Sequence, residues 1–279
     1  MSNTLPVWTS LQRTQADAIT ALLVSDIHLS PDEPALMQAF LALLDDALTL
    51  PNLAQLWILG DWFAAWLGDD LLSTPSTAAW LAPMLARLRR LNQRGCAVLV
   101  LRGNRDFLLG QGFCAAFGGQ LLAEPYHWQV GKQRVRVEHG DALCTDDTRY
   151  QRFRAVIQNP FTKRALLALP KSQRQRLATR LRASSQQANH VKTQTAQHIM
   201  DVNRDAVQRA LQSADRLLHG HTHRPAEHVL PAGKRRLVLG DWRVTPTKSV
   251  DAVIGVLLAG DIQLVKCQFL PATKRLSAV

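Results

Sequence analysis

Five short polar motifs, each at the end of an apolar stretch of strand length, constrain this chain more than any other feature. They are Asp26-Ile27-His28, Gly60-Asp61, Gly103-Asn104-Arg105-Asp106, His139-Gly140-Asp141 and His219-Gly220-His221-Thr222-His223. Because polar groups outside the carboxyl ends of strands meet in one crevice of an α/β sheet, we expect the motifs to converge. Their carboxylates, amide and imidazoles, without a thiolate, suit Mn²⁺, Fe²⁺ or Zn²⁺.

These groups are numerous enough to hold two divalent cations. Asp61 follows a buried strand and a glycine, and its two carboxylate oxygens can each bind one cation, so it is the candidate bridging ligand. The other predicted ligands are two pairs with i, i+2 spacing, Asp26 with His28 and His221 with His223, together with Asn104 and His139. Any one motif alone is more often a turn aspartate or a structural histidine, but five in this order indicate a site. A dinuclear centre is typical of enzymes that hydrolyse phosphate esters and anhydrides.

The order of strand and helix patterns predicts a layered α/β/β/α sandwich. Strands are expected at residues 21–24, 56–59, 98–101, 134–138, 216–218 and 237–239, with a closing hairpin of 253–258 and 262–269. Helices are expected at 34–50 and 78–91. Residues 150–215 show helical patterns, such as 171–183 and 203–212, and no strand pattern. We therefore predict a polar extension at 1–20 and one domain at 21–279, with a helical cap inserted at about 150–215.

The composition narrows the class of protein. A chain of 279 residues that is 47% hydrophobic can bury a large core. Its apolar runs are only as long as strands, and no signal peptide is evident. Its four cysteines lack CxxC spacing. Together these features predict a cytosolic protein with reduced thiols. The net charge of +11 is local, because residues 149–192 hold 11 Lys and Arg and no Asp or Glu. Nucleic acid, an anionic membrane surface or a phosphorylated substrate would each suit that charge.

The five motifs in this order resemble the calcineurin-like metallophosphoesterase superfamily over about residues 21–245. The resemblance implies one metal bound by Asp26, His28, Asp61 and His223, and a second bound by Asp61, Asn104, His139 and His221. It also implies that Asp61, Asn104, Arg105 and His139 are catalytic, and that a hydroxide held by two cations, expected to be Mn²⁺, attacks the phosphorus.

One departure from the superfamily pattern concerns the reaction. Many members have histidine where this chain has Arg105, and that imidazole often protonates an alkoxide leaving group. Arginine cannot donate a proton at neutral pH, but it can hold phosphate oxygens through paired hydrogen bonds. The replacement favours a leaving group that is stable without protonation. It therefore favours cleavage of a diphosphate over that of a phosphodiester.

Further motifs resemble the UDP-2,3-diacylglucosamine hydrolases of lipid A biosynthesis. They are residues 60–63 with Trp66, then 68–70, 103–110, 143–147, 150–154, 199–203 and 219–226. The chain departs from these enzymes at Arg102, where they often have histidine, and in the greater distance of Asp26 from the N-terminus.

This second resemblance implies release of UMP and 2,3-diacylglucosamine 1-phosphate (lipid X). The substrate contacts that it implies are Asn104, Arg105, Asp147, Ser185, Asn189, Lys192 and His221. It also implies a monomer on the cytoplasmic side of the inner membrane of a Gram-negative bacterium, with an anionic lipid surface and no nucleic acid as partner.

The cap pattern has two readings. Its leucines, Leu166, Leu167, Leu169, Leu177 and Leu181, are interleaved with Arg164, Lys171, Arg174, Arg176 and Arg180. Such a pattern predicts either a small helical bundle with a solvated face or an amphipathic lid that shelters acyl chains on anionic lipid. With a lipid substrate, Trp66, Tyr150 and Phe153, and also Trp62, become candidates to line an acyl chamber, although isolated aromatic residues are more often part of the core.

Two rival functions stay open at this point. The first is a metallophosphoesterase acting on a soluble nucleotide diphosphate or a cyclic nucleotide, against which the apolar cap and Arg105 both argue. The second is a nucleic-acid-binding protein, which the charge alone suggests. No helix-turn-helix, RRM or zinc-finger signature accompanies that charge.

Overall fold

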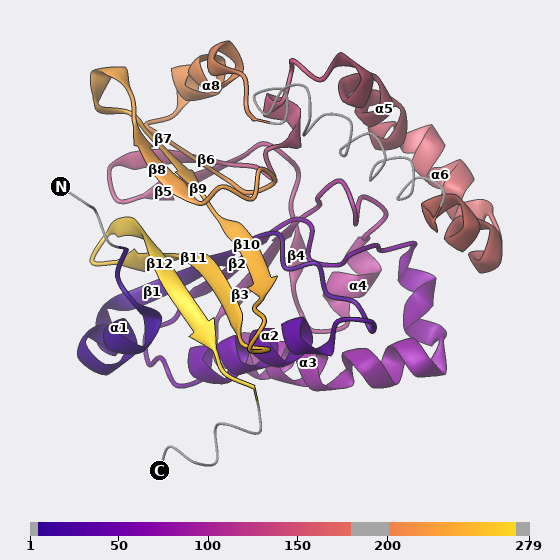
Figure 1. The fold of residues 1–279 in the computed structure, drawn as a ribbon, viewed down its shortest axis with the longest axis horizontal. Coiled ribbons are helices and arrows are strands. Elements are labelled where there is room, and N and C mark those ends of the chain that lie inside the picture. The colour runs from indigo at the N-terminus through magenta and orange to yellow at the C-terminus, as the bar shows by residue number, and fades with distance from the viewer. Residues whose placement is uncertain (1–4, 180–200, 272–279) are drawn as a thin grey trace.

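A computed structural model describes residues 5–179 and 201–271 and contains two mixed β-sheets that pack on one another (Figure 1). The seven-stranded sheet has the order β10-β11-β1-β2-β3-β4, with β12 paired to β11. The five-stranded sheet has the order β5-β6-β7-β9-β8. The first sheet is built on three parallel strands, β1, β2 and β3, and the second on parallel β6, β7 and β9.

The strands are β1 Ile19–Val24, β2 Gln55–Leu59, β3 Ala97–Leu101, β4 Gln120–Leu121, β5 Tyr126–Val130, β6 Gln133–Val137, β7 Arg216–His219, β8 Ala226–Val229, β9 Arg235–Val238, β10 Gly240–Val244, β11 Val250–Leu258 and β12 Asp261–Phe269. The α-helices are α1 Trp8–Gln15, α2 Pro34–Ala47, α3 Pro75–Gln93, α4 Gln111–Ala115, α5 Thr148–Gln158, α6 Pro160–Ala168 and α8 Arg204–Ala210. Residues 171–179 are also helical, and a short 3-10 helix, η2, spans Asp69–Ser73.

The strands of the larger sheet are apolar on both faces because both faces are covered. Leu22 and Val24 of β1 face a core shared with α2 and α3, whereas Ala21 and Leu23 face a second core between the two sheets. The same alternation continues along β2 and β3. A third core packs α8 against Leu217 of the smaller sheet. These three cores separate four layers, and the predicted α/β/β/α sandwich is confirmed.

The parallel strands bring the polar motifs to one edge of the molecule. Val24 is in register with Ile58, and Leu59 with Leu101, so β1, β2 and β3 end side by side. The loops beyond them stay paired, since the Asp26 amide donates to the Gly60 carbonyl at 3.1 Å. In the second sheet β6 and β7 end together in the same way.

All strands predicted from the sequence are present, but some elements lacked a sequence signal. The structure adds β4, β5, β8 and β10 and the helices α1 and α4. The prediction for residues 1–20 needs correction, because residues 8–15 form a helix whose Trp8 is 2% exposed and donates to Asp46 at 2.9 Å. Ile19 and Thr20 already belong to β1. This part of the extension is therefore packed on the sandwich.

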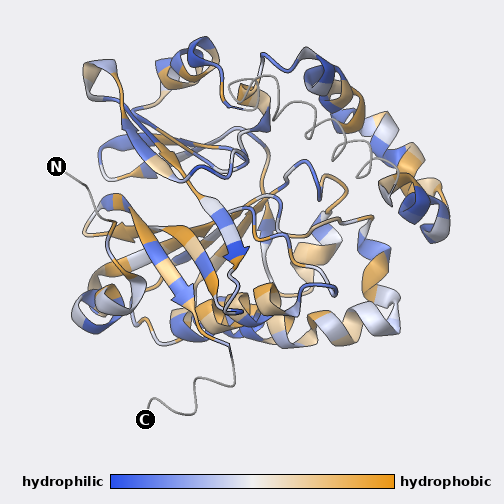
Figure 2. Cartoon of the chain, in the orientation of Figure 1, coloured by the Kyte–Doolittle hydropathy of each residue, from blue (hydrophilic) through white to orange (hydrophobic). Residues whose placement is uncertain are grey.

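Between β6 and β7, the structure describes helices and no strand in residues 148–179 and 201–215. We call α5, α6 and residues 171–179 the cap helices. Figure 2 shows strongly hydrophilic and hydrophobic residues side by side on them, unlike the mostly apolar strands of the larger sheet. Among the described helices, none combines the length and the apolar character that crossing a membrane requires.

Candidate metal centre

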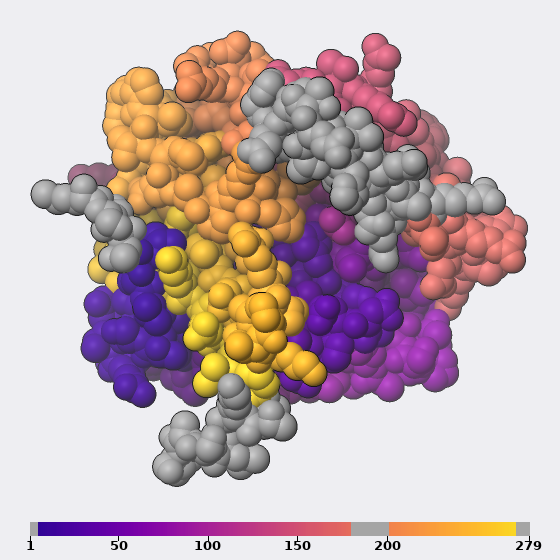
Figure 3. Space-filling model, viewed as in Figure 1, coloured from indigo at the N-terminus to yellow at the C-terminus, as the bar shows by residue number. Residues whose placement is uncertain are grey.

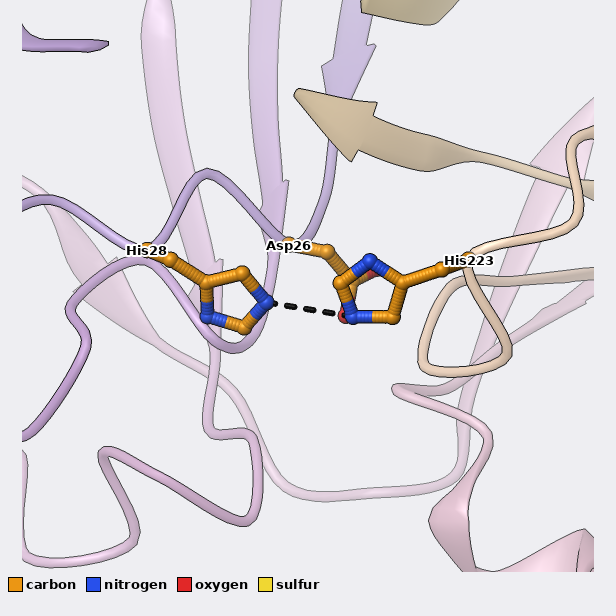
Figure 4. Close-up of side chains that lie close together, drawn as sticks. All are labelled: Asp26, His28 and His223. Carbon is orange, nitrogen blue, oxygen red and sulfur yellow. Dashed lines mark hydrogen bonds and ion pairs between the residues drawn. The ribbon is translucent and has the colours of Figure 1, made fainter. Parts of the chain in front are cut away.

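The first group of donors comes from the ends of β1 and β7. Asp26 and His28 follow β1, and His223 follows β7 (Figure 4). The two imidazole Nε2 atoms of His28 and His223 lie 3.1 Å apart, and His223 Nε2 lies 3.7 Å from Asp26 Oδ1. Nitrogen donors about 2.1 Å from one cation lie roughly 3 Å from each other, so this spacing fits a shared ion.

The second group contains Asp61, Asn104 and His139. His139 Nε2 lies 3.1 Å from Asn104 Oδ1 and 3.7 Å from Asp61 Oδ1. The other carboxylate oxygen of Asp61, Oδ2, lies 3.9 Å from His28 Nδ1 in the first group. Asp61 thus lies between the two groups, although the ring nitrogen of His28 that it faces is not the one that faces His223. Asp26 belongs to both clusters of candidate metal donors, one with His28 and His223 and the other with Asp61 and His139.

His221 is the remaining predicted ligand, and it contacts a residue of each group. Its ring centroid lies 5.1 Å from that of His139. Its backbone amide donates to Asp26 Oδ2 at 2.9 Å. All seven predicted metal ligands are therefore brought together.

Two buried polar atoms of the site support the presence of a cation. Asp26 Oδ1 and His28 Nδ1 are buried and lack a hydrogen-bond partner among the described residues. Asp26 as a whole is 0% exposed. A buried, unpaired carboxylate oxygen is costly unless it is neutralised or coordinated. The donor set and its spacing fit divalent cations, and no thiolate takes part.

Polar groups lie on the far side of two imidazoles and orient them toward the site: a backbone carbonyl behind His139 and a carboxylate behind His223. His139 Nδ1 lies 2.9 Å from the Leu59 carbonyl, which accepts its proton, and Nε2 on the other side of the ring points toward Asn104 and Asp61. His223 Nδ1 faces Asp241 Oδ1 at 3.8 Å. Contacts of this kind fix the tautomer of a metal-binding histidine. Asp241 follows the strand predicted at 237–239, and no place behind His223 was predicted for it from the sequence.

The backbone of the site is strained. Nine residues other than glycine have a positive φ in the described part of the chain, and five of them are predicted ligands: Asp26, His28, Asp61, His221 and His223. Such conformations cost free energy and are concentrated at functional sites. Gly60, with φ +84°, also has to be glycine because a Cβ atom there would lie 2.6 Å from the Gly103 amide.

Asp106 holds two of the ligand loops together and was not given a role from the sequence. It is 0% exposed, and its carboxylate accepts the Trp62 amide at 2.8 Å and the Gly103 amide at 2.6 Å. The first amide follows Asp61 directly, and the second precedes Asn104. Asp106 therefore fixes the bridging aspartate relative to the amide ligand.

The electrostatics of the site favour cations. Burial raises the pKa of Asp61 to about 7. Burial by itself lowers the pKa of His139, but the surrounding carboxylates, Asp61 first, outweigh it and raise that pKa to about 10. Mainly through burial, the pKa of His28 falls to about 2 and that of His221 to about 3. The carboxylates around the site thus favour positive charge at His139, whereas burial keeps His28 and His221 neutral at pH 7.

Arg105 lies at the rim of this site. Its backbone amide donates to Asp61 Oδ1 at 2.8 Å, and its guanidinium Nε lies 3.5 Å from Asp61 Oδ2. The side chain is 43% exposed, whereas that of Asp61 is 2% exposed. The guanidinium can therefore reach a ligand that enters from solvent while remaining next to the metal donors.

The other predicted contacts are only partly placed. Ser185, Asn189 and Lys192 lie outside the described residues, as do Arg180 and Leu181 of the cap pattern. Asp147 is half-buried and accepts the Tyr150 amide at 3.1 Å, which caps α5. It lies six residues after Asp141, so it belongs to the same loop region as the site.

The predicted acyl-chamber residues separate into two groups. Trp66 is 2% exposed and packs in the core beside Phe63 and Phe113, so its ring offers no surface to a ligand in this structure. Trp62 also lies in this core. The packing of Trp66 argues against the prediction that it lines an acyl chamber. Tyr150 and Phe153 lie on α5, half-buried, and the Tyr150 ring stacks 6.1 Å from that of His221.

The fold and the site together define a class of protein. Residues 19–225 match the family model of the calcineurin-like phosphoesterases, and the chain belongs to that family. Within it, the chain belongs to the UDP-2,3-diacylglucosamine hydrolases. It is 43% identical to the UDP-2,3-diacylglucosamine hydrolase of Pseudomonas syringae pv. tomato, an alignment that covers 79% of this chain and 87% of that protein.

Two further relatives of this chain carry the same name. The enzyme of the same name from Pseudomonas putida is 42% identical, over 83% of this chain and 95% of that one. The one from Bordetella parapertussis is 44% identical, over 79% and 84%. A dimetal phosphatase from Danio rerio aligns with a TM-score of 0.44 and 12% identity, over 91% of this chain and 99% of that one.

Proposed function

We propose that the protein hydrolyses the diphosphate of UDP-2,3-diacylglucosamine to UMP and 2,3-diacylglucosamine 1-phosphate, a step of lipid A biosynthesis. The observation that carries the proposal is the position of Asp61 between two donor groups, with Arg105 beside it at the solvent rim. The relatives that are 42–44% identical to this chain over the aligned residues are named for this reaction.

The residues of the site have different roles in the proposed reaction. Asp26, His28 and His223 would hold one divalent cation, and Asn104, His139 and His221 a second, with Asp61 shared. Bound there, the cations, which we propose to be Mn²⁺, would polarise the phosphoryl oxygens and make water more acidic. Arg105 holds the oxygens of the diphosphate through its planar fork of donors and supplies no proton. The leaving phosphate monoester needs none.

A direct assay tests the proposal. Purified protein is incubated with UDP-2,3-diacylglucosamine and Mn²⁺, and UMP is measured, with UDP-glucose as the unacylated control. We expect UMP from the acylated substrate and much less from the control. Equal turnover of both would point to a soluble nucleotide diphosphate as the substrate, and absence of UMP from either would contradict the assigned reaction.

We further propose that the cap helices bring the protein to an anionic membrane surface. Phe161 of α6 is 76% exposed and Val156 of α5 is 58% exposed. Both lie within the stretch of residues 149–192 that has 11 basic residues and no acidic one. Exposed apolar groups among cations are typical of interfacial binding, and we assign the charge to lipid, not to nucleic acid. Arg174 does not contribute to this surface, because it is 4% exposed.

Replacing Phe161 with serine is expected to weaken binding to phosphatidylglycerol vesicles about tenfold, because burial of a phenylalanine is worth roughly 1.5–3 kcal/mol. Binding should also weaken as salt rises, since charge attraction is screened over about 8–10 Å. Vesicle cosedimentation measures both. Val229→Ser is the matched control, because Val229 is equally exposed at 76% but lies on β8, outside the cap. Equal loss in both variants would contradict a membrane role for the cap.

A further inference from the structure

One arginine of the cap helices faces the sandwich instead of solvent. Arg174, in helical residues 171–179, is 4% exposed, although its neighbour Arg176 is exposed. Its guanidinium forms a two-pronged ion pair with Asp70, with Nη1 2.9 Å from Oδ1 and Nη2 on Oδ2. It also donates to the carbonyls of Leu67 and Leu169. A planar fork that is satisfied on all sides fixes a side chain far better than a surface pair does.

Residues 67–70, which Arg174 contacts, have a glycine at the point of closest approach. Gly68 has a φ of +131°, and a Cβ atom at that position would collide with the Arg174 guanidinium and lie 2.8 Å from Leu167 Cδ2. Lys171, one turn earlier in the same helix, donates to the Asp70 carbonyl at 2.8 Å and to Thr74 Oγ1 at 3.1 Å. The close approach and the second cation show that the cap is seated closely on residues 67–74.

Residues 67–70 are in turn fixed to the loop that carries Arg105. The Trp66 amide donates to the Arg105 carbonyl at 3.2 Å. The carboxylate of Asp69 accepts the Trp66 indole at 3.0 Å and the Gly110 amide at 2.9 Å. The place where the cap is seated is therefore held rigidly relative to the rim of the metal site.

The cap is also held at its beginning. Tyr150 and Arg154 of α5 donate to Asp141 Oδ2 at 2.7 and 2.8 Å, and Asp141 lies two residues after His139. The cap helices extend from this point along the right side of Figure 1. In the space-filling view the salmon-coloured end of the cap lies against the purple first half of the chain (Figure 3). The cap thus has one carboxylate–arginine contact near each end.

We propose that Arg174 is a positioning residue that determines the preference for acylated substrates, because its ion pair with Asp70 fixes the far end of the cap beside the Arg105 loop. The inference rests on the proposed function, since that substrate carries its acyl chains on the glucosamine, on the side of the diphosphate opposite to the uridine. When the ion pair is absent, the cap stays joined at Asp141 and through Lys171, but its far end is held less firmly to residues 67–74. The polar and apolar parts of the substrate are then no longer held in one geometry.

Arg174→Ala and Asp70→Asn test this inference, with Arg209→Ala, at an exposed position of α8 outside the cap helices, as the control that removes the same charge. We expect KM for UDP-2,3-diacylglucosamine to rise on the order of tenfold in the first two variants, with a smaller change in kcat. The ratio of kcat/KM for this substrate to that for bis(p-nitrophenyl) phosphate should fall by a similar factor. Amide hydrogen exchange in residues 160–179 should accelerate in the same variants.

Asp70→Asn guards against a folding artefact, because the side chain of Asp70 is 44% exposed and the substitution keeps its shape. Metal content and the thermal unfolding midpoint are measured for each variant. Hydrogen exchange and selectivity equal to those of Arg209→Ala would overturn the inference. If the wild type releases no UMP, the proposed function fails, whereas the exchange experiment still decides whether the ion pair holds the cap.

Discussion

Replacing Asp61 with alanine is expected to reduce kcat/KM for UDP-2,3-diacylglucosamine more than about 10³-fold. Cations that polarise a phosphoryl group supply several kcal/mol, and roughly each 1.4 kcal/mol is a factor of ten in rate. Asp61 turns one carboxylate oxygen toward His28 and the other toward His139, so its loss affects both donor groups. Variants of His28 or Asn104, each in one group, should lose less activity. UMP release measures the rate, and plasma mass spectrometry measures metal per chain, which should fall from two toward one or none.

Asp17→Ala is the control for this experiment. Asp17 is exposed and precedes β1, at the opposite end of the strand from Asp26, so the substitution should change neither activity nor metal content. An Asp61→Ala protein that keeps two tightly bound cations would show that Asp61 does not bridge them.

Replacing Arg105 with alanine is expected to lower kcat about 10²–10³-fold, as does the loss of a donor to the developing charge in other enzymes. Metal content should be unchanged, because the hydrogen bond to Asp61 Oδ1 comes from the backbone amide of residue 105 and survives the substitution. Steady-state kinetics and metal analysis of the same preparation measure the two effects separately.

Arg105→Lys sharpens the test, because lysine keeps the charge and lacks the planar fork, and it should give an intermediate kcat. Arg90→Ala, at an exposed position near the end of α3, is the charge-matched control. Normal kcat in Arg105→Ala would mean that the side chain contributes nothing to the transition state.

The proposed metal ligands could be selected from the sequence because each lies at a fixed distance from a strand. Asp26 and Asp61 each follow an apolar run by two residues, and parallel strands in register must bring such positions together. The spacing of His221 and His223 has the same local origin. The layered fold followed from the same signals, since strands apolar on both faces have to be covered on both faces.

The burial of residues whose contacts are distant in the chain was determined only by the tertiary structure. Arg174 shares the interleaved pattern of its neighbours, and only contact with Asp70, 104 residues earlier, makes it a buried ion-pair partner and not part of a lipid-facing surface. Trp66 likewise became core through Phe113.

Within the site, the roles of Asp106 and Asp241 were also determined by the tertiary structure. Their residue types are common in turns, and their roles come from the amide groups and the imidazole that folding places in front of their carboxylates. The sequence by itself determined which groups can bind metal and at which strand ends they lie, because strand periodicity and motif spacing are local. Which charged and aromatic side chains are buried was determined only by the packing of the cap and the loops on the sandwich, because burial is a property of both surfaces in contact.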